Sequence, residues 1–175
     1  QGSFGGTNAL GTVTITGATT EFQTAVDADG NLTIQNGSSL ELNSTSGSLA
    51  LSGSFTDNNG SSSGLIANGR QTTFNGSVDQ DIDGSAPITF GPVDLNNGSN
   101  QVVTRVPTSF GTVSSSSSNG SLFVDADADL TITQSSNPTP AVGGDITVRG
   151  ATLTLQGSNL FDVNGTLNFL GSGEG

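Results

Sequence analysis

Apolar and polar residues alternate along this chain in short, repeated units. In the stretch from Gly143 to Gly171, GGDITVRGATLTLQGSNLFDVNGTLNFLG, the apolar residues Ile146, Leu153, Leu160 and Leu167 are each seven positions apart. All but Leu160 are followed two positions later by another apolar side chain, and a glycine closes each unit. Alternation with a period of two is typical of half-buried β-strands. The stretch therefore predicts a series of short strands, each followed by a tight corner.

The same pattern covers most of the chain, and helix signals are absent. No window has the i, i+3, i+4, i+7 spacing of an amphipathic helix, while Gly, Ser, Thr and Asn occur throughout. The length suits one domain, so we expect a single all-β domain over residues 1–175 with flexible, Gly-rich ends. We expect strands within these ranges: 11–17, 30–37, 38–44, 47–53, 72–84, 87–95, 100–106, 121–134 and 143–171.

The spacing between strands predicts how they are arranged. In the densest stretches strands begin roughly seven to nine residues apart, whereas turns in a β-sandwich recur about every 8–12 residues. Strands this close can form the walls of a coil that stacks on the coil below. We therefore predict a parallel β-helix, or β-solenoid, of about seven or eight coils with roughly 20–25 residues each. A β-sandwich or jelly-roll subunit of the kind found in pilins is the alternative fold.

A stacked coil makes predictions for individual side chains. Gln80 stands in line with the apolar Val78 and Ile82, so we expect it to be buried and to bond to Gln or Asn side chains of neighbouring coils. Asn-Gly corners supply positive φ angles. Four apolar side chains near the end of the sequence are expected to be buried: Leu153, Leu155, Leu167 and Phe169. Their polar neighbours are expected to face outward: Thr152, Thr154 and Asn168.

The composition limits the chemistry that the chain can perform. Hydrophobic residues make up 31% and charged residues 10% of the chain, which has no Cys, Met, Trp, Tyr or His. Its three positive charges are Arg70, Arg105 and Arg149, so it has no Lys either. These absences exclude disulfides, thiolate and imidazole metal sites, a Ser-His-Asp triad, a Schiff base and a P-loop. We therefore expect no enzymatic activity.

The net charge and the hydropathy narrow the partners and the location. A formal charge of −12 argues against nucleic acid and anionic membrane surfaces as partners. No apolar run approaches the length of about 20 residues that a membrane-spanning helix needs, so we expect no membrane insertion. A chain without Lys or oxidisable Cys and Met is typical of a long-lived product outside the cell. We therefore predict an extracellular or cell-surface location.

One segment resembles a known kind of repeat. Residues Thr72–Ser99, TTFNGSVDQDIDGSAPITFGPVDLNNGS, resemble a phrase common in bacterial secreted and surface repeat proteins. The phrase consists of Phe-x-Gly, Gln-x-Ile-x-Gly, an apolar-x-Phe strand, a Leu and an Asn-Asn-Gly corner. More loosely, the alternating units of most of the chain resemble the parallel β-helix passengers of filamentous-haemagglutinin-like adhesins. The resemblance implies a surface fibre or adhesin rather than a reaction.

Runs of alternating aspartates are the candidate metal ligands. Carboxylate oxygens at this density suit Ca²⁺, the one cofactor that we consider. One run begins like an EF-hand loop, but Phe90 stands where that loop needs a Glu. The alternative interpretation is a solvated acidic face that protects strand edges. The two runs contain Asp79, Asp81 and Asp83, and Asp125, Asp127 and Asp129, with Asp27 and Asp29 as a shorter third case.

Two other kinds of site were weighed against the same residues. Paired carboxylates serve glycosidases, but no Tyr, Trp, His or Lys is present to bind a sugar or shift a pKa. A regular array of outward Thr side chains would indicate ice binding, but the Thr-x-Thr pairs do not recur once per coil. These pairs occur at Thr12, Thr14 and Thr16, at Thr131 and Thr133, and at Thr152 and Thr154.

Strong strands near both ends of the sequence predict self-association. Ranges Thr12–Thr16 and Thr166–Leu170 would each leave an open strand edge, which is a template for another chain. We therefore expect a structural subunit of an extracellular filament, sheath or adhesive surface layer. Its partner would be a second copy of itself, joined head-to-tail by strand pairing or insertion. The alternative is a monomeric extracellular module that binds a glycan or ice.

Overall fold

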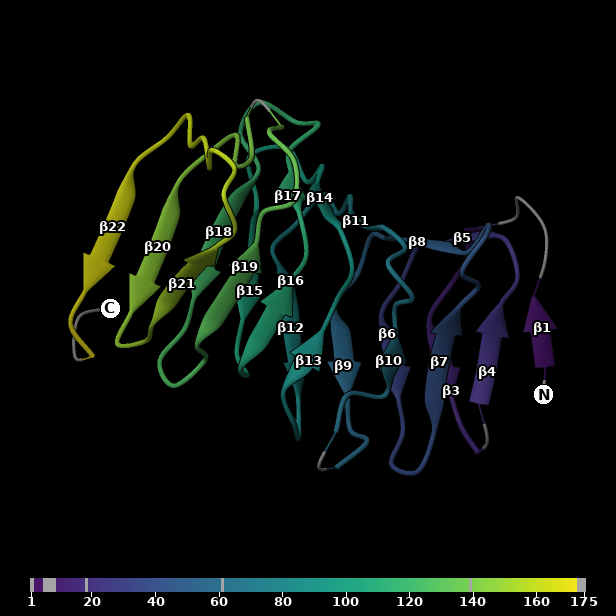
Figure 1. Ribbon diagram of the computed structural model, residues 1–175. Helices are drawn as coiled ribbons and strands as arrows, with labels where there is room; N and C mark the ends of the chain where they lie inside the picture. The colour runs from purple at the N-terminus through teal and green to yellow at the C-terminus, as the bar shows by residue number, and fades with distance from the viewer. Residues whose placement is uncertain (1, 5–8, 18, 61, 139, 173–175) are drawn as a thin grey trace.

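The chain folds as a stack of parallel strands. The computed structural model describes residues 2–4, 9–17, 19–60, 62–138 and 140–172, and these ranges contain 22 short strands and no helix. Every pairing between the described strands is parallel. The strands form a β-solenoid of about seven turns, seen in Figure 1 from its purple N-terminal end to its yellow C-terminal end. The predicted parallel β-helix is therefore confirmed.

Three walls enclose the core, and each wall receives strands from successive coils. The first wall consists of two sheets, A and D, which meet where β10 contacts β13. Sheet A contains β1 (Gly2–Phe4), β4 (Thr19–Phe22), β7 (Ser39–Leu42) and β10 (Leu65–Ile66). Sheet D contains β13 (Ile88–Thr89), β16 (Thr108–Phe110), β19 (Leu130–Thr133) and β21 (Leu153–Gln156).

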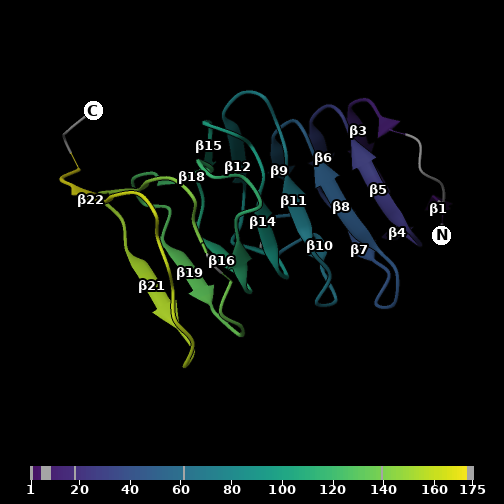
Figure 2. The same cartoon turned by 90° about the horizontal axis from the view of Figure 1, so that it is seen from above.

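The second and third walls are continuous sheets. Figure 2 shows β5, β8, β11 and β14 of the second wall side by side. This wall, sheet B, contains β2 (Ala9–Leu10), β5 (Ala25–Ala28), β8 (Ser48–Leu51), β11 (Thr72–Phe74), β14 (Val93–Leu95) and β17 (Val113–Ser114). The third wall, sheet C, contains β3 (Val13–Ile15), β6 (Leu32–Ile34), β9 (Phe55–Asp57), β12 (Gln80–Gly84), β15 (Gln101–Thr104), β18 (Ser121–Val124), β20 (Ile146–Arg149) and β22 (Leu167–Leu170).

The coils differ in length more than the sequence predicts. The pair Gly2 and Thr20 is 18 positions apart in sequence, whereas the pair Phe55 and Ile82 is 27 positions apart. Corner loops absorb this difference, because the strands themselves remain two to five residues long. In the described ranges no helix occurs that could span a membrane.

Alternation along the strands places one apolar column after another inside the solenoid. Leu32, Phe55 and Ile82, for example, are register neighbours in sheet C and are completely buried. Phe90, just after β13, joins the walls through edge-to-face contacts with three other rings, its centroid 5.1 Å from that of Phe55, 5.8 Å from that of Phe74 and 5.6 Å from that of Phe110. Such contacts add about 0.5–1.5 kcal/mol per pair beyond the burial of area.

Two buried glutamines complete the backbone pairing where strands leave gaps. Gln80 is buried, as predicted, but its partners are backbone groups rather than stacked amides. Its Nε2 donates to the carbonyl oxygens of Leu51 and Gly53, both at 2.7 Å, and its Oε1 accepts the N–H of Gly76 at 2.8 Å. Gln134 bonds in the same way to the N–H and the carbonyl of Val113, both at 3.1 Å. A carboxamide can replace a peptide group because it carries the same donor and acceptor.

Asn-Gly corners supply part of the required backbone geometry. Positive φ occurs at the glycine of four of these dipeptides, Gly37, Gly60, Gly69 and Gly98, and also at Asn68. A positive-φ corner favours glycine, which has no Cβ to clash with the backbone, and to a lesser degree asparagine and aspartate. The predicted role of the dipeptide is confirmed at these corners.

Two details of the aspartate runs differ from the prediction. The range 121–134 is not one strand: β18 ends at Val124, β19 begins at Leu130, and between them Asp127 has a φ of 63°. Val78 lies at the corner before β12 and is 64% exposed instead of facing inward. In both places the alternation continues in the sequence while the chain turns a corner in space. The predicted flexible ends concern residues 1, 5–8 and 173–175, which lie outside the described residues.

Candidate functional site

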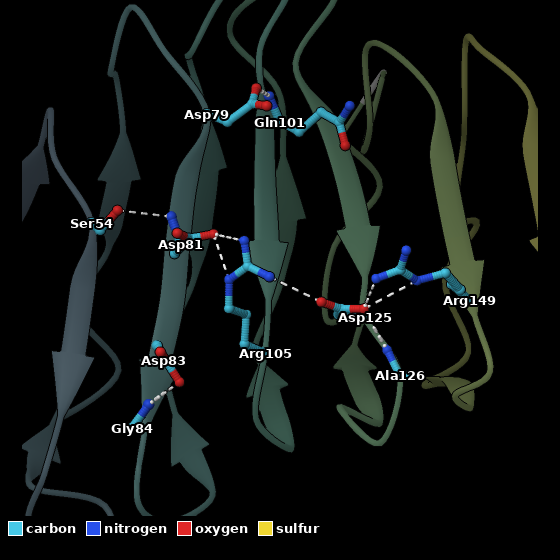
Figure 3. A network of polar contacts seen from close by, with 10 residues as sticks. All are labelled: Ser54, Asp79, Asp81, Asp83, Gly84, Gln101, Arg105, Asp125, Ala126 and Arg149. Atoms are coloured by element: carbon cyan, nitrogen blue, oxygen red, sulfur yellow. Dashed lines mark hydrogen bonds and ion pairs between the residues drawn. The ribbon is translucent and has the colours of Figure 1, made fainter. Parts of the chain in front are cut away.

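In the first run of aspartates, Asp79 lies just before β12, while Asp81 and Asp83 lie on β12 at the outer face of sheet C. The three carboxylates have different partners (Figure 3). Asp79 accepts the N–H of Gln101 on the next coil at 2.9 Å. Asp81 accepts a hydrogen bond from the guanidinium of Arg105. Asp83 accepts one from the N–H of its own neighbour Gly84 at 2.7 Å. The carboxylates are therefore used one by one, in contacts between coils and at a corner.

Arg105 connects the first run of aspartates with the second. It follows β15 directly, and its Nη2 lies 2.8 Å from Asp81 while its Nη1 lies 2.9 Å from Asp125. Arg149, the last residue of β20, reaches back to Asp125, with Nε at 3.2 Å from Oδ1 and Nη2 also in contact. Acid and base thus alternate over four neighbouring strands. We call Asp81, Arg105, Asp125 and Arg149 the charge ladder.

Asp125 is the centre of this ladder. Only 17% of its side chain is exposed, against 41% for Asp81 and 43% for Arg105. The hydrogen bond from Arg149, helped by the N–H of Ala126 and the charges of both arginines, lowers the pKa of Asp125 in spite of its burial. Arg149 is itself supported by Phe123, whose ring centroid lies 5.2 Å from the guanidinium carbon, a cation–π contact worth about 0.5–1 kcal/mol.

The remaining two aspartates of the second run do not join the ladder. Asp127 occupies the corner, and Asp129 accepts the N–H of Thr152 on the next coil at 2.8 Å. Among the described residues no three carboxylates are grouped so that they could hold a metal ion. Calcium binding stays a prediction, and the contacts that engage five of the six carboxylates favour the alternative of an acidic, solvated face. The third pair, Asp27 and Asp29, lies in and just after β5 on another wall.

Hydroxyl groups form one ordered column on sheet D. The register aligns Thr89, Ser109, Thr131 and Thr154 on four consecutive strands. On one side of this column Thr133 has Gln156 as its register neighbour. A shorter column on sheet C aligns Thr14, Thr33 and Thr56 on β3, β6 and β9. In neither column do the Thr-x-Thr pairs themselves recur once per coil, as the sequence indicated. Neither column extends to a two-dimensional Thr array, because the register neighbour of Thr133 is Gln156 and that of Thr56 on β12 is Asp83.

The C-terminal end of the solenoid exposes apolar side chains. The prediction of burial was wrong for three of four residues: Leu155 is 48%, Leu167 45% and Phe169 67% exposed, while Leu153 is half-buried. Their register partners one coil earlier, Ile132, Ile146 and Val148, are at most 1% exposed. The last coil therefore directs its side chains inward like every other, but no further coil among the described residues covers them. Nearby, Leu160 is 71% exposed, and Leu170, which faces outward at the end of β22, is 36% exposed.

The N-terminal end is open as well, though less apolar. β1, β2 and β3 are the outermost strands of sheets A, B and C. Leu10 and Val13 are half-buried, while their register partners Ala28 and Leu32 are completely buried. Both ends of the described structure thus present strand edges and uncovered core side chains.

Known proteins add no further identification. Comparison of the chain with family models, with curated proteins and with solved structures finds no match. The function therefore has to be argued from the residues and their geometry.

Proposed function

We propose that the chain is a structural, non-enzymatic subunit of an extracellular filament, sheath or adhesive surface layer, assembled head-to-tail through its terminal strands. The observation that carries the proposal is the open C-terminal end, where Leu155, Leu160, Leu167, Phe169 and Leu170 are exposed. Elsewhere in the described residues only Ile66 and Val78 are large, apolar and comparably exposed. Exposed apolar residues that gather in one place mark an association surface.

The free energies of the two contributions indicate that association requires both burial of apolar side chains and pairing of the edge strands. Burying the exposed part of a Leu or Phe side chain gains about 1–2 kcal/mol, so five such residues gain roughly 5–10 kcal/mol. Association costs about 4–15 kcal/mol in lost freedom of motion. Apolar burial alone is therefore marginal, and pairing of the edge strands, at about 0.5–1.5 kcal/mol net per hydrogen bond, decides the outcome. Parallel stacking of one copy on the next supplies both contributions.

Other features support the same proposal. The carboxylates of the charge ladder are engaged with arginines and, for Asp125, with the N–H of Ala126 rather than directed into a cleft, which suits a structural role. A chain without Cys, Met or Lys suits a durable extracellular material. The resemblance to adhesin passengers stays a prediction that agrees with a surface location.

A charge placed at the open end tests the proposal. Phe169→Asp puts a carboxylate in the proposed contact, where its burial would be costly, so we expect loss of assembly in sedimentation velocity and electron microscopy. Val78→Asp is the matched control, because Val78 is 64% exposed, against 67% for Phe169, but lies at a corner in the middle of the stack. Circular dichroism checks that both variants keep the β-fold. Equal assembly by both variants would contradict the proposal.

The hydroxyl column of sheet D favours a second candidate, a monomeric extracellular module that binds a glycan or ice. This candidate predicts that the unmodified chain stays monomeric at high concentration and that Thr131→Ala weakens retention on polysaccharide or ice. A column of hydroxyl groups that is one residue wide offers a ligand fewer contacts than the open apolar end offers a second copy of the chain. We therefore place it second.

A further inference from the structure

One inward column of sheet C runs through the whole solenoid. Strand by strand, the register aligns Val13, Leu32, Phe55, Ile82, Thr104, Val124, Val148 and Phe169. The six inner members are at most 1% exposed, whereas Val13 is half-buried and Phe169 is 67% exposed. Every inner member has a register neighbour on both sides. Val13 lacks one on the N-terminal side of the stack, and Phe169 lacks one on the C-terminal side.

We infer that a second copy of this chain docks on the open C-terminal end with its β3 placed beside β22, so that Val13 of that copy covers Phe169. This inference rests on the proposed function and specifies the register of its contact. Because all strands are parallel, a copy that continues the stack keeps the same strand direction and the same inside and outside. The outward neighbours in this register are Leu170 of one copy and Thr14 of the next.

The strands of the first wall are also compatible with stacking of a second copy in this register. β21 is the outermost strand of sheet D at the C-terminal end, and β1 is the outermost strand of sheet A at the N-terminal end. Sheets A and D belong to one wall, which is joined where β10 contacts β13. Stacking β3 on β22 therefore also places β1 beside β21. Two walls of the incoming coil find an open edge at once, which fixes its rotation about the axis.

Charge favours a copy of the chain as the occupant. The first charged residue is Glu21, and after residue 150 only Asp162 and Glu174 are charged, although the chain carries −12 overall. Most acidic residues thus lie between residues 21 and 145, and few charges lie in the two terminal segments that would meet. Like charges at the ends would oppose stacking of identical copies. With this distribution of charge, copies of the chain repel each other mainly along their sides, and their ends can associate.

Engineered cysteines test the register directly, because the chain contains no cysteine. The variant with Thr14→Cys and Leu170→Cys places the two thiols of adjacent copies on neighbouring strands about 4.8 Å apart, within the Cα separation that a disulfide accepts. The matched control combines Thr14→Cys with Gln156→Cys, an exposed position on the other wall. Both proteins are incubated with oxidised glutathione at a concentration where the unmodified chain assembles. The covalent products are separated on non-reducing gels.

We expect a series of covalent dimers, trimers and longer multimers from the first variant and mainly monomer from the control. Thr14→Cys alone should give no products beyond dimers. If the chain assembles but the first variant cross-links no better than the control, the register is wrong while the filament proposal stands. If the unmodified chain does not assemble, both proposals fail.

Discussion

Val148 and Phe169 are register partners on adjacent strands, yet Val148 is 1% exposed and Phe169 is 67% exposed. Both side chains point into the solenoid, and the difference arises because, within the part of the chain that the structure describes, a coil lies beyond Val148 and none lies beyond Phe169. Burial in this fold is therefore a property of the stack rather than of the single strand. The same relation holds between Ile132 and Leu155.

The Ile132 and Leu155 pair gives a test of this relation by stability. Ile132→Ala removes a completely buried side chain and should lower the free energy of unfolding by about 2–5 kcal/mol. Leu155→Ala removes a side chain that is 48% exposed and should cost less than half of that in the monomer. Urea unfolding at low protein concentration, followed by circular dichroism, measures both values. Equal losses would show that the last coil is covered in solution.

Sequence patterns predicted the direction of these side chains but not their exposure. Alternation placed Leu155, Leu167 and Phe169 inward, and their buried register partners show that this direction is right. Their exposure depends on what stacks beyond the last coil, which no local pattern contains. Interior members of the same columns, such as Ile82, have a coil on each side, so for them direction and burial coincide.

The charge ladder was beyond prediction for a different reason. Arg105 and Asp125 are 20 positions apart, and Asp125 and Arg149 are 24 positions apart. They meet only because two coils of different length bring them to the same height and the same wall. The corner at Asp127, with its positive φ, likewise separates aspartates that alternation alone would place on one face. Coil length and corner position are set by loops, for which the sequence signal is weakest.

Gln80 should prove necessary for stability in spite of being polar. Gln80→Leu keeps a similar volume but leaves the Gly76 N–H and two carbonyl oxygens without their partner. An unsatisfied buried polar group costs about 1–3 kcal/mol, so we expect a clear fall in the melting temperature. Gln156→Leu, at an exposed position, is the control and should change the melting temperature little. A stable Gln80→Leu protein would mean that water replaces the amide.

Acid should weaken the charge ladder. The pKa of Asp125 is lowered in the folded protein from its ordinary value of 3.8, chiefly by Arg149. Its contribution to stability is therefore complete above about pH 4 and is lost as the pH falls through the lower, folded pKa. Asp125→Asn and Arg149→Gln should each flatten the dependence of unfolding free energy on pH in that acidic range. An unchanged slope in both variants would show that the contact does not form in solution.

Calcium separates the two interpretations of the aspartates. A ligand that binds only the folded state raises its melting temperature. Because the ladder and backbone N–H groups occupy five of the six carboxylates, we expect millimolar Ca²⁺ and a chelator to give the same melting curve. A rise with Ca²⁺ that disappears in an Asp79→Asn variant would instead establish a metal site.

The central claim is that the axis of the solenoid is the axis of the assembly, and X-ray diffraction from aligned fibres of the assembled protein tests it most directly. Head-to-tail stacking keeps every strand perpendicular to the fibre, so the spacing of about 4.8 Å between strands should appear as a meridional reflection, along the fibre axis. The same spacing on the equator would mean that subunits associate through their sides. That result, or the absence of fibres at any concentration of the unmodified chain, would contradict the account.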